Sequence, residues 1–329
     1  MPMLAIALLA LVGLVAPDPA ASAPPPRRGP QSHQKQPAPA LGSPPAILQW
    51  INAYRSRPDP KVLPEAVKAM SRLALFRDLD AGGVYVGFMA GVLGDNPVEA
   101  DRLVAAMFPM PPEDQVAIVR AIAYSGLDDW KGLLQRFAER MPARRVLIQR
   151  HLESKLPTRD KLKLEGAPVN LDTLWGYYFA TGRPAEVNRI VDALAWVKDG
   201  NDADRLTAGN MAKWTLANNA QLDKELLDHL RNEASRRPKE VAKELNEVVE
   251  AAETFETARI RKEAQAALEE LKRKGPENVR KLTFWGMAGQ TALALGCVVA
   301  GTLGHPEIAV PCVIGGAASS AALRILTPQ

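Results

Sequence analysis

Aromatic residues, histidine and cysteine are all scarce in this sequence. Aromatics make up 5% of its 329 residues, and there are four histidines and two cysteines. So few aromatic rings argue against a surface that stacks on bases or sugars, and a net charge of +4 is too small to indicate a nucleic-acid partner. No two histidines have the spacing of a zinc site on a helix. The composition therefore predicts no metal, no cofactor and no nucleic-acid partner.

Motifs of common enzyme classes are missing as well. The sequence has no G-x-S-x-G, no Walker loop and no G-x-G-x-x-G, and neither cysteine has a histidine partner nearby that would make it a nucleophile. The segment Asp78-Leu-Asp80-Ala-Gly82 opens like a calcium-binding loop. Gly82 takes the place of its fifth-position ligand, and Met89 takes that of its bidentate glutamate. We therefore interpret it as a turn, and we expect no catalytic, cofactor-binding or metal-ligating residue.

The N-terminal segment is apolar and short. Residues 3–15 form an uncharged run below the ~20 residues of a spanning helix, and Ala21-Ser22-Ala23 has the form of a cleavage site. Residues 1–23 therefore predict a secretory signal peptide, with an uncleaved anchor or a cytosolic protein as the alternatives. Residues 24–46 hold eight prolines and no acidic residue, which predicts a disordered, basic, Pro-rich linker.

Short helical patterns separated by Pro and Gly fill residues 47–237. This predicts an all-α body of short antiparallel helices in an α-solenoid or superhelix. The weaker alternative for 82–88, GGVYVGF, is a strand. The expected helices are 47–56, 61–77, 83–93, 97–107, 112–124, 127–140, 143–155, 171–181, 185–197, 203–218 and 222–236.

One helix pair is better formed than the others. In residues 170–200, Asn170 is the expected cap of a helix that Gly182 ends, and Pro184 suits the first turn of the next helix. This stretch resembles a degenerate tetratricopeptide-type repeat, and the positions that carry the resemblance are Tyr178, Gly182, Val187, Val191 and Leu194. Val187 replaces the alanine of that family. The resemblance implies a peptide-binding or assembly scaffold.

Residues 238–281 predict one long charged helix with a basic flank. Apolar residues follow a 4-3-4-3 spacing from Val241 to Phe255 and resume at Ile260 after a five-residue step. Such a narrow seam suits packing against a neighbouring helix or pairing as a coiled coil. A homo-oligomer formed through this seam is the second of these alternatives.

Residues 282–329 predict an apolar helical hairpin. Residues 282–302 carry no charge, and 21 residues are enough to span a bilayer. Small residues repeat every four positions, a stripe that lets helices pack closely in lipid: Ala288, Ala292, Gly296, Ala300 and Gly304. Cys297 and Cys312 are symmetric about the turn and would meet in a disulfide if the helix rotations allow it. The alternatives are a buried soluble hairpin and a segment that oligomerises or inserts into a partner.

The charges that precede this hairpin conflict with export. Lys272, Arg273, Lys274, Arg280 and Lys281 favour the cytoplasmic side, whereas a cleaved signal would place them outside. We expect an exported, membrane-anchored protein of the periplasm or cell envelope. The alternative is an inner-membrane protein with a cytoplasmic body.

One stretch of the body is rich in cations and forms a candidate surface for an anionic partner. Its members are Arg140, Arg144, Arg145, Arg150, Lys155, Arg159, Lys161 and Lys163. Together these features predict a non-enzymatic scaffold or adaptor of the cell envelope that binds a protein partner in grooves between its helices. One alternative is an envelope enzyme acting on cell-wall polymer, with Asp128/Asp129 or Asp78/Asp80 as its carboxylates. The other is a membrane-active protein with a controlled inserting hairpin.

Overall fold

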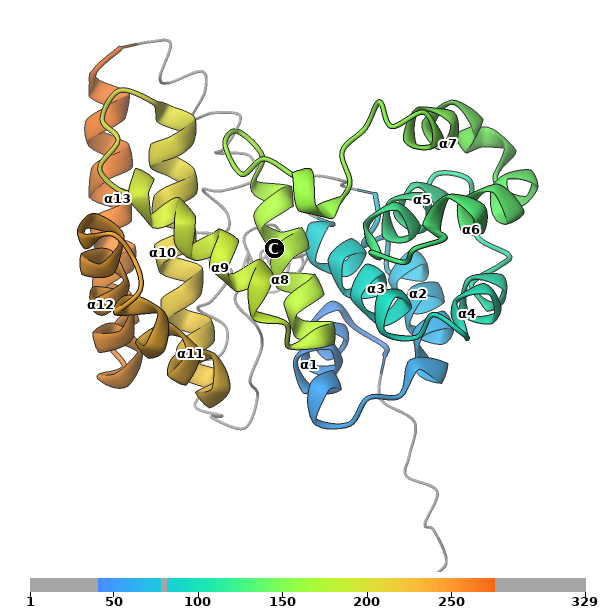
Figure 1. Cartoon of the computed structure of the whole chain (residues 1–329), viewed down its shortest axis with the longest axis horizontal. Helices are drawn as coiled ribbons and strands as arrows, with labels where there is room; N and C mark the ends of the chain where they lie inside the picture. The colour runs from blue at the N-terminus through green and yellow to red at the C-terminus, as the bar shows by residue number, and fades with distance from the viewer. Residues whose placement is uncertain (1–40, 78–81, 276–329) are drawn as a thin grey trace, which may run out of the picture. The chain divides into compact units, whose positions relative to one another are not determined.

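The computed structural model describes residues 41–77 and 82–275, and every regular element within these ranges is a helix (Figure 1). The expectation of an all-α body is confirmed, including a helix in place of the alternative strand at 82–88. The α-helices are α1 (Pro44–Ala53), α2 (Leu63–Arg72), α3 (Gly83–Asp95), α4 (Ala100–Ala106), α5 (Gln115–Tyr124), α6 (Trp130–Phe137), α7 (Arg145–Leu152), α8 (Pro168–Thr181), α9 (Pro184–Asp192), α10 (Ala203–Leu222), α11 (Lys224–Ala234), α12 (Lys239–Glu253) and α13 (Thr257–Arg273). Short 3-10 helices extend or join them: η1 (Tyr54–Ser56), η2 (Pro60–Val62), η3 (Ala138–Arg140), η4 (Pro142–Arg144), η5 (Arg159–Lys161) and η6 (Ala193–Trp196).

Local chemistry sets several helix ends. Gly182 ends α8 in the left-handed conformation at φ +67°, and Pro184 opens α9, both as predicted. Two boundaries differ from expectation. Ser43 accepts a hydrogen bond from the backbone N–H of Ala46, so α1 begins at Pro44, inside the segment expected to be a disordered linker. Asn170 is not a cap, because α8 already begins at Pro168, whose fixed φ suits the first turn.

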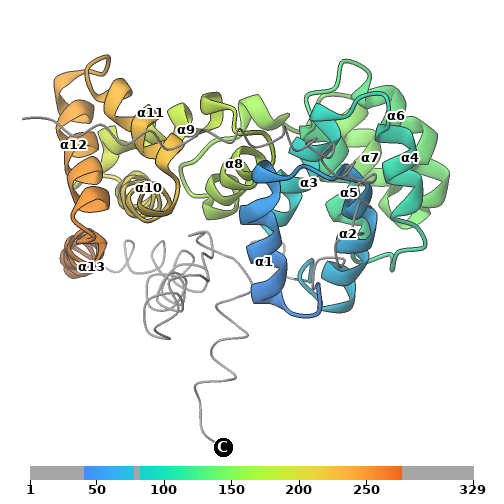
Figure 2. The ribbon, with the colours of Figure 1, turned by 90° about the horizontal axis from the view of Figure 1, so that it is seen from below.

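Helices α3 and α8 form the most extensive helix–helix contact in the described residues and lie side by side in both views (Figures 1 and 2). Glycines make this close approach possible. A Cβ placed on Gly87 would lie 2.0 Å from the backbone oxygen of Thr173, and one on Gly176 would lie 2.0 Å from that of Val84. The backbones therefore touch directly, and every residue of α3 from Gly83 to Leu93 is buried.

This contact joins elements that are distant in the chain, because α4 to α7 separate α3 from α8 in sequence. Tetratricopeptide-like repeats pack each helix pair mainly on its neighbours in sequence. The α8–α9 pair does form, but the most extensive contact of α8 is with α3. Through the indole N–H of Trp175, α8 also donates a hydrogen bond of 3.0 Å to Thr215 of α10.

Helix α10 is the centre of the group formed by α10 to α13, and it contacts α11, α12 and α13 (Figure 2). The prediction of a single long helix within residues 238–281 is wrong, because the structure has two helices, α12 and α13, in this segment. The chain breaks at Phe255, which has φ +59° and is 71% exposed, and α13 folds back to contact both α12 and α10. The five-residue step in the apolar spacing marks this break. One continuous helix would leave much of the seam without a partner, whereas folding back buries Val248 and Ile260 together with their neighbours.

Candidate functional site

A groove of about 480 Å³ opens beside the ends of α1, α3 and α8 and the start of α11. Its wall combines an aromatic ring and prolines with charged side chains. The lining residues are Tyr54, Arg55, Pro58, Pro60, Asp95, Asn96, Ala180, Thr181, Gly182 and Glu225. Burial, followed by the charges of Asp59 and Asp95, raises the pKa of Tyr54 to about 12, so its phenol is neutral at pH 7.

Arg55 is held rigidly in this wall. Its guanidinium lies 4.6 Å from the centre of the Tyr178 ring and donates a hydrogen bond of 3.2 Å to the Tyr178 hydroxyl. That hydroxyl donates to Asp223 at 2.9 Å, and Asp223 also forms an ion pair with Arg55. Glu225 Oε2 lies 3.6 Å from Arg55 Nη1. The groove therefore presents a fixed guanidinium, paired with two carboxylates, beside apolar side chains, an arrangement that can bind a peptide segment.

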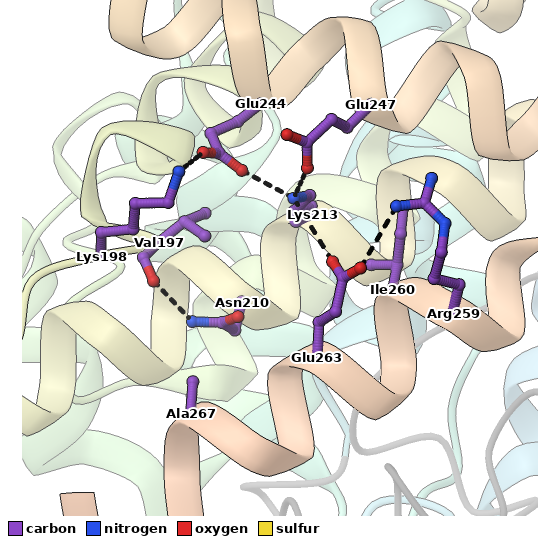
Figure 3. Close-up of a pocket in the computed structure, with 10 residues that line it drawn as sticks. All are labelled: Val197, Lys198, Asn210, Lys213, Glu244, Glu247, Arg259, Ile260, Glu263 and Ala267. Atoms are coloured by element: carbon purple, nitrogen blue, oxygen red, sulfur yellow. Dashed lines mark hydrogen bonds and ion pairs between the residues drawn. The ribbon is translucent and has the colours of Figure 1, made fainter. Parts of the chain in front are cut away.

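A second cavity, of about 360 Å³, lies among η6, α10, α12 and α13 and surrounds a buried lysine (Figure 3). The side chain of Lys213 is 5% exposed, and its ammonium lies 2.6 Å from Glu244 Oε2 and 2.5 Å from Glu247 Oε2. Glu263 of α13 lies 4.0 Å from it. The other oxygen of Glu244 accepts a hydrogen bond from Lys198 at 2.5 Å.

Each carboxylate in this cavity thus has a cation partner. Arg259 completes the set, because its Nη1 lies 3.2 Å from Glu263 Oε1. Burial raises the pKa of Glu244, but hydrogen bonds from Lys198 and Lys213 outweigh it, so the pKa lies below its usual value. These carboxylates are neutralised ion-pair members. They brace α12 and α13 against α10 and are poorly suited to act as general acids or bases.

Sequence reasoning missed this lysine, although a signal was present. Lys213 is the only charged residue in 206–222, and a lone charge in a largely uncharged helix must find a partner when the helix is buried. Glu244 and Glu247 are spaced i, i+3 and therefore share one face of α12. The sequence does not state that these two features face each other.

The predicted basic surface has two parts in the structure. Arg145 and Arg150 of α7 are exposed, as are Arg140, Lys155, Lys161 and Lys163. Arg144 donates to the backbone oxygen of Pro112 at 2.9 Å, and Lys155 forms an ion pair of 2.6 Å with Glu153.

Arg159, by contrast, packs inward. Its guanidinium carbon lies 3.6 Å from the centre of the Tyr177 ring, and its Nε lies 2.9 Å from Glu186. It therefore ties η5 to α8 and α9.

His151 of α7 is buried beside two aromatic rings. Ring centres of Tyr124 and Trp130 lie 6.3 and 6.5 Å from the imidazole, and its Nδ1 has no hydrogen-bond partner within the described residues. Burial, followed by the positive charges of Arg120 and Arg150, lowers the pKa of His151 to about 4. The imidazole is therefore neutral at pH 7.

The two carboxylates proposed for the enzyme alternative that the structure describes, Asp128 and Asp129, do not form a catalytic pair. Asp129 caps α6 by accepting a hydrogen bond of 3.2 Å from Gly132 N, and it pairs with Arg136 at 3.0 Å. Asp128 is exposed. Asp78 and Asp80 lie outside the described residues, as do Cys297, Cys312 and the small-residue stripe of 288–304. In the part of the chain that is described, no helix combines the length and hydrophobicity needed to cross a membrane.

Comparison with known proteins gives no relative: the chain matches no family model, no curated protein and no solved structure. The resemblance to tetratricopeptide-type repeats therefore stays a prediction from residues 170–200.

Proposed function

We propose that this chain is a non-enzymatic helical scaffold or adaptor of the cell envelope. Its helices, arranged as a superhelix, would bind a protein partner in an inter-helical groove. Residues 282–329 would anchor or oligomerise it as an apolar hairpin, after export directed by residues 1–23. The proposal carries forward the fold class and segment order that the sequence predicts.

The observation that carries this proposal is the groove beside α1, α3 and α8. It joins the apolar rings of Pro58 and Pro60 to the guanidinium of Arg55, whose position is fixed by Tyr178 and Asp223. A peptide of a partner protein fits such a site by burying apolar side chains while one of its backbone carbonyls accepts a hydrogen bond from the guanidinium. The pairing of the carboxylates around Lys213 supports a structural role for the second cavity.

Site-specific photo-crosslinking in intact cells tests the proposal. A photoreactive amino acid replaces Pro58, which is exposed and lines the groove, and a matched variant carries it at Val98, which is 95% exposed and does not line it. We expect discrete adducts of one or a few masses from position 58, recovered in the envelope fraction, and none of those masses from position 98. Identical adducts from both positions, or none from position 58, would contradict partner binding. Adducts confined to the cytosolic fraction would contradict the envelope location alone.

A further inference from the structure

Helix α7 exposes two arginines that have no acidic partner among the residues that the structure describes. Arg145 and Arg150 are exposed and take part in no ion pair there. Most exposed arginines elsewhere are neutralised, as Arg102 is by Glu99 at 2.9 Å and Arg236 by Glu233 at 3.2 Å. The positive charge of α7 is thus available to another molecule.

The same face of α7 carries apolar surface. Val146 is 76% exposed and is one of four large hydrophobic side chains of the described residues that stand out in this way. Because residues four apart lie on one side of a helix, Val146 and Arg150 are neighbours. Arg145 lies about 140° around the helix from Arg150, at the other edge of the exposed side, so that Val146 lies between the two arginines. An aliphatic side chain flanked by cations suits the boundary between lipid headgroups and acyl chains.

Other charges near this face increase its positive potential. Arg120 and Arg150 both lower the pKa of the buried His151, which places two positive charges close to one imidazole. The acidic residue nearest in the chain, Glu153, forms an ion pair with Lys155 and accepts a hydrogen bond from Gln149.

We propose that this face of α7 docks on anionic phospholipid headgroups. A guanidinium binds a phosphate through two parallel hydrogen bonds, and lipid phosphates can move laterally to match two arginines on a short, convex helix. An acidic protein would instead need a fixed arrangement of carboxylates that matches them. The inference rests on the envelope location proposed above, and it adds a contact between the helical body and the bilayer surface.

Binding of the purified full-length chain to lipid vesicles tests this inference. Because residues 282–329 can bind lipid regardless of its charge, the measured quantity is the ratio of two partition coefficients. One is for vesicles of phosphatidylcholine with phosphatidylglycerol, and the other is for phosphatidylcholine alone. Replacing Arg145 and Arg150 together by Gln should lower this ratio roughly 30-fold, since each cation near an anionic surface contributes about 1 kcal/mol.

Two control variants make the result specific. Arg102→Gln with Arg236→Gln removes the same net charge from cations that are already paired, and it should leave the ratio nearly unchanged. Arg145→Lys with Arg150→Lys keeps the charge and should retain most of the preference for phosphatidylglycerol. It also provides a readout if the Gln variant folds poorly.

Two results would overturn the inference: no preference of the unaltered chain for phosphatidylglycerol, or an equal loss in the Arg102/Arg236 control. The first would leave an acidic protein as the partner of this face. Because the assay uses purified protein and defined lipid, its failure is distinguishable from failure of crosslinking in the groove.

Discussion

Two junctions in this molecule hold helices together by opposite means. Where α3 meets α8, glycines have no side chain to separate the helices, so one backbone lies directly on the other. Where α10 meets α12 and α13, a lysine is buried and three glutamates surround it. The first junction depends on close packing and the second on charge balance, so the two should respond differently to mutation and pH.

The largest effect is expected at the charged junction. Replacing Lys213 by Ala leaves Glu244 and Glu247 without their shared cation, and breaking a buried ion pair on one side costs about 3–5 kcal/mol. Urea unfolding of the full chain measures this loss. Arg102→Ala, which removes an exposed pair with Glu99, is the control and should change stability little. A loss for Lys213→Ala as small as the control's would mean that water solvates the cavity and that the junction is not held by charge.

A smaller loss is expected at the glycine junction. In Gly87→Ala the new methyl group meets the backbone oxygen of Thr173, which cannot move away as a flexible side chain could. Overpacking of this kind destabilises by about 1–3 kcal/mol, even though alanine favours the helix.

The control for this substitution is Gly42→Ala, where an added Cβ has no atom within 4 Å. Its unfolding free energy should stay within about 0.5 kcal/mol of the original. Equal stability of Gly87→Ala and the control would show that α3 and α8 are not in backbone contact.

The smallest expected effect is a difference in stability between the two junctions at acid pH. The pKa of Glu244 is lower in the folded chain than its usual value, so its contribution to stability is complete above that usual value, near 4.5, and is lost as pH falls through the folded-state pKa. Hydrogen exchange below pH 4.5 should therefore show α12 and α13 opening before α3 and α8. In Glu244→Gln the acid-induced opening of α12 and α13 should be smaller. If α12 and α13 also open first at pH 7, the order of opening does not arise from the titration of Glu244.

Helices and their boundaries were predictable where they depend on hydrogen bonds and apolar spacing within a few residues. The segment at 83–93 contains glycines four apart and was still expected to be helical. The C-terminal end of α8 follows from Gly182, and the start of α9 follows from Pro184. The break near Phe255 was visible as a five-residue step, but its meaning depends on what the seam packs against. Of the groove, the sequence indicated only that helices would leave space between them.

The sequence by itself determined an all-helical body, many of its helix boundaries and a cation-rich stretch around α7. These follow from hydrogen bonds and side-chain periodicity within a few residues. Only the tertiary structure decided that α3 packs on α8, that Arg55 is fixed by Tyr178 and Asp223, and that Lys213 meets glutamates from two other helices. Such partners are tens to more than a hundred residues apart. Their selection depends on which surfaces exclude water together, and this is a property of the whole packed chain.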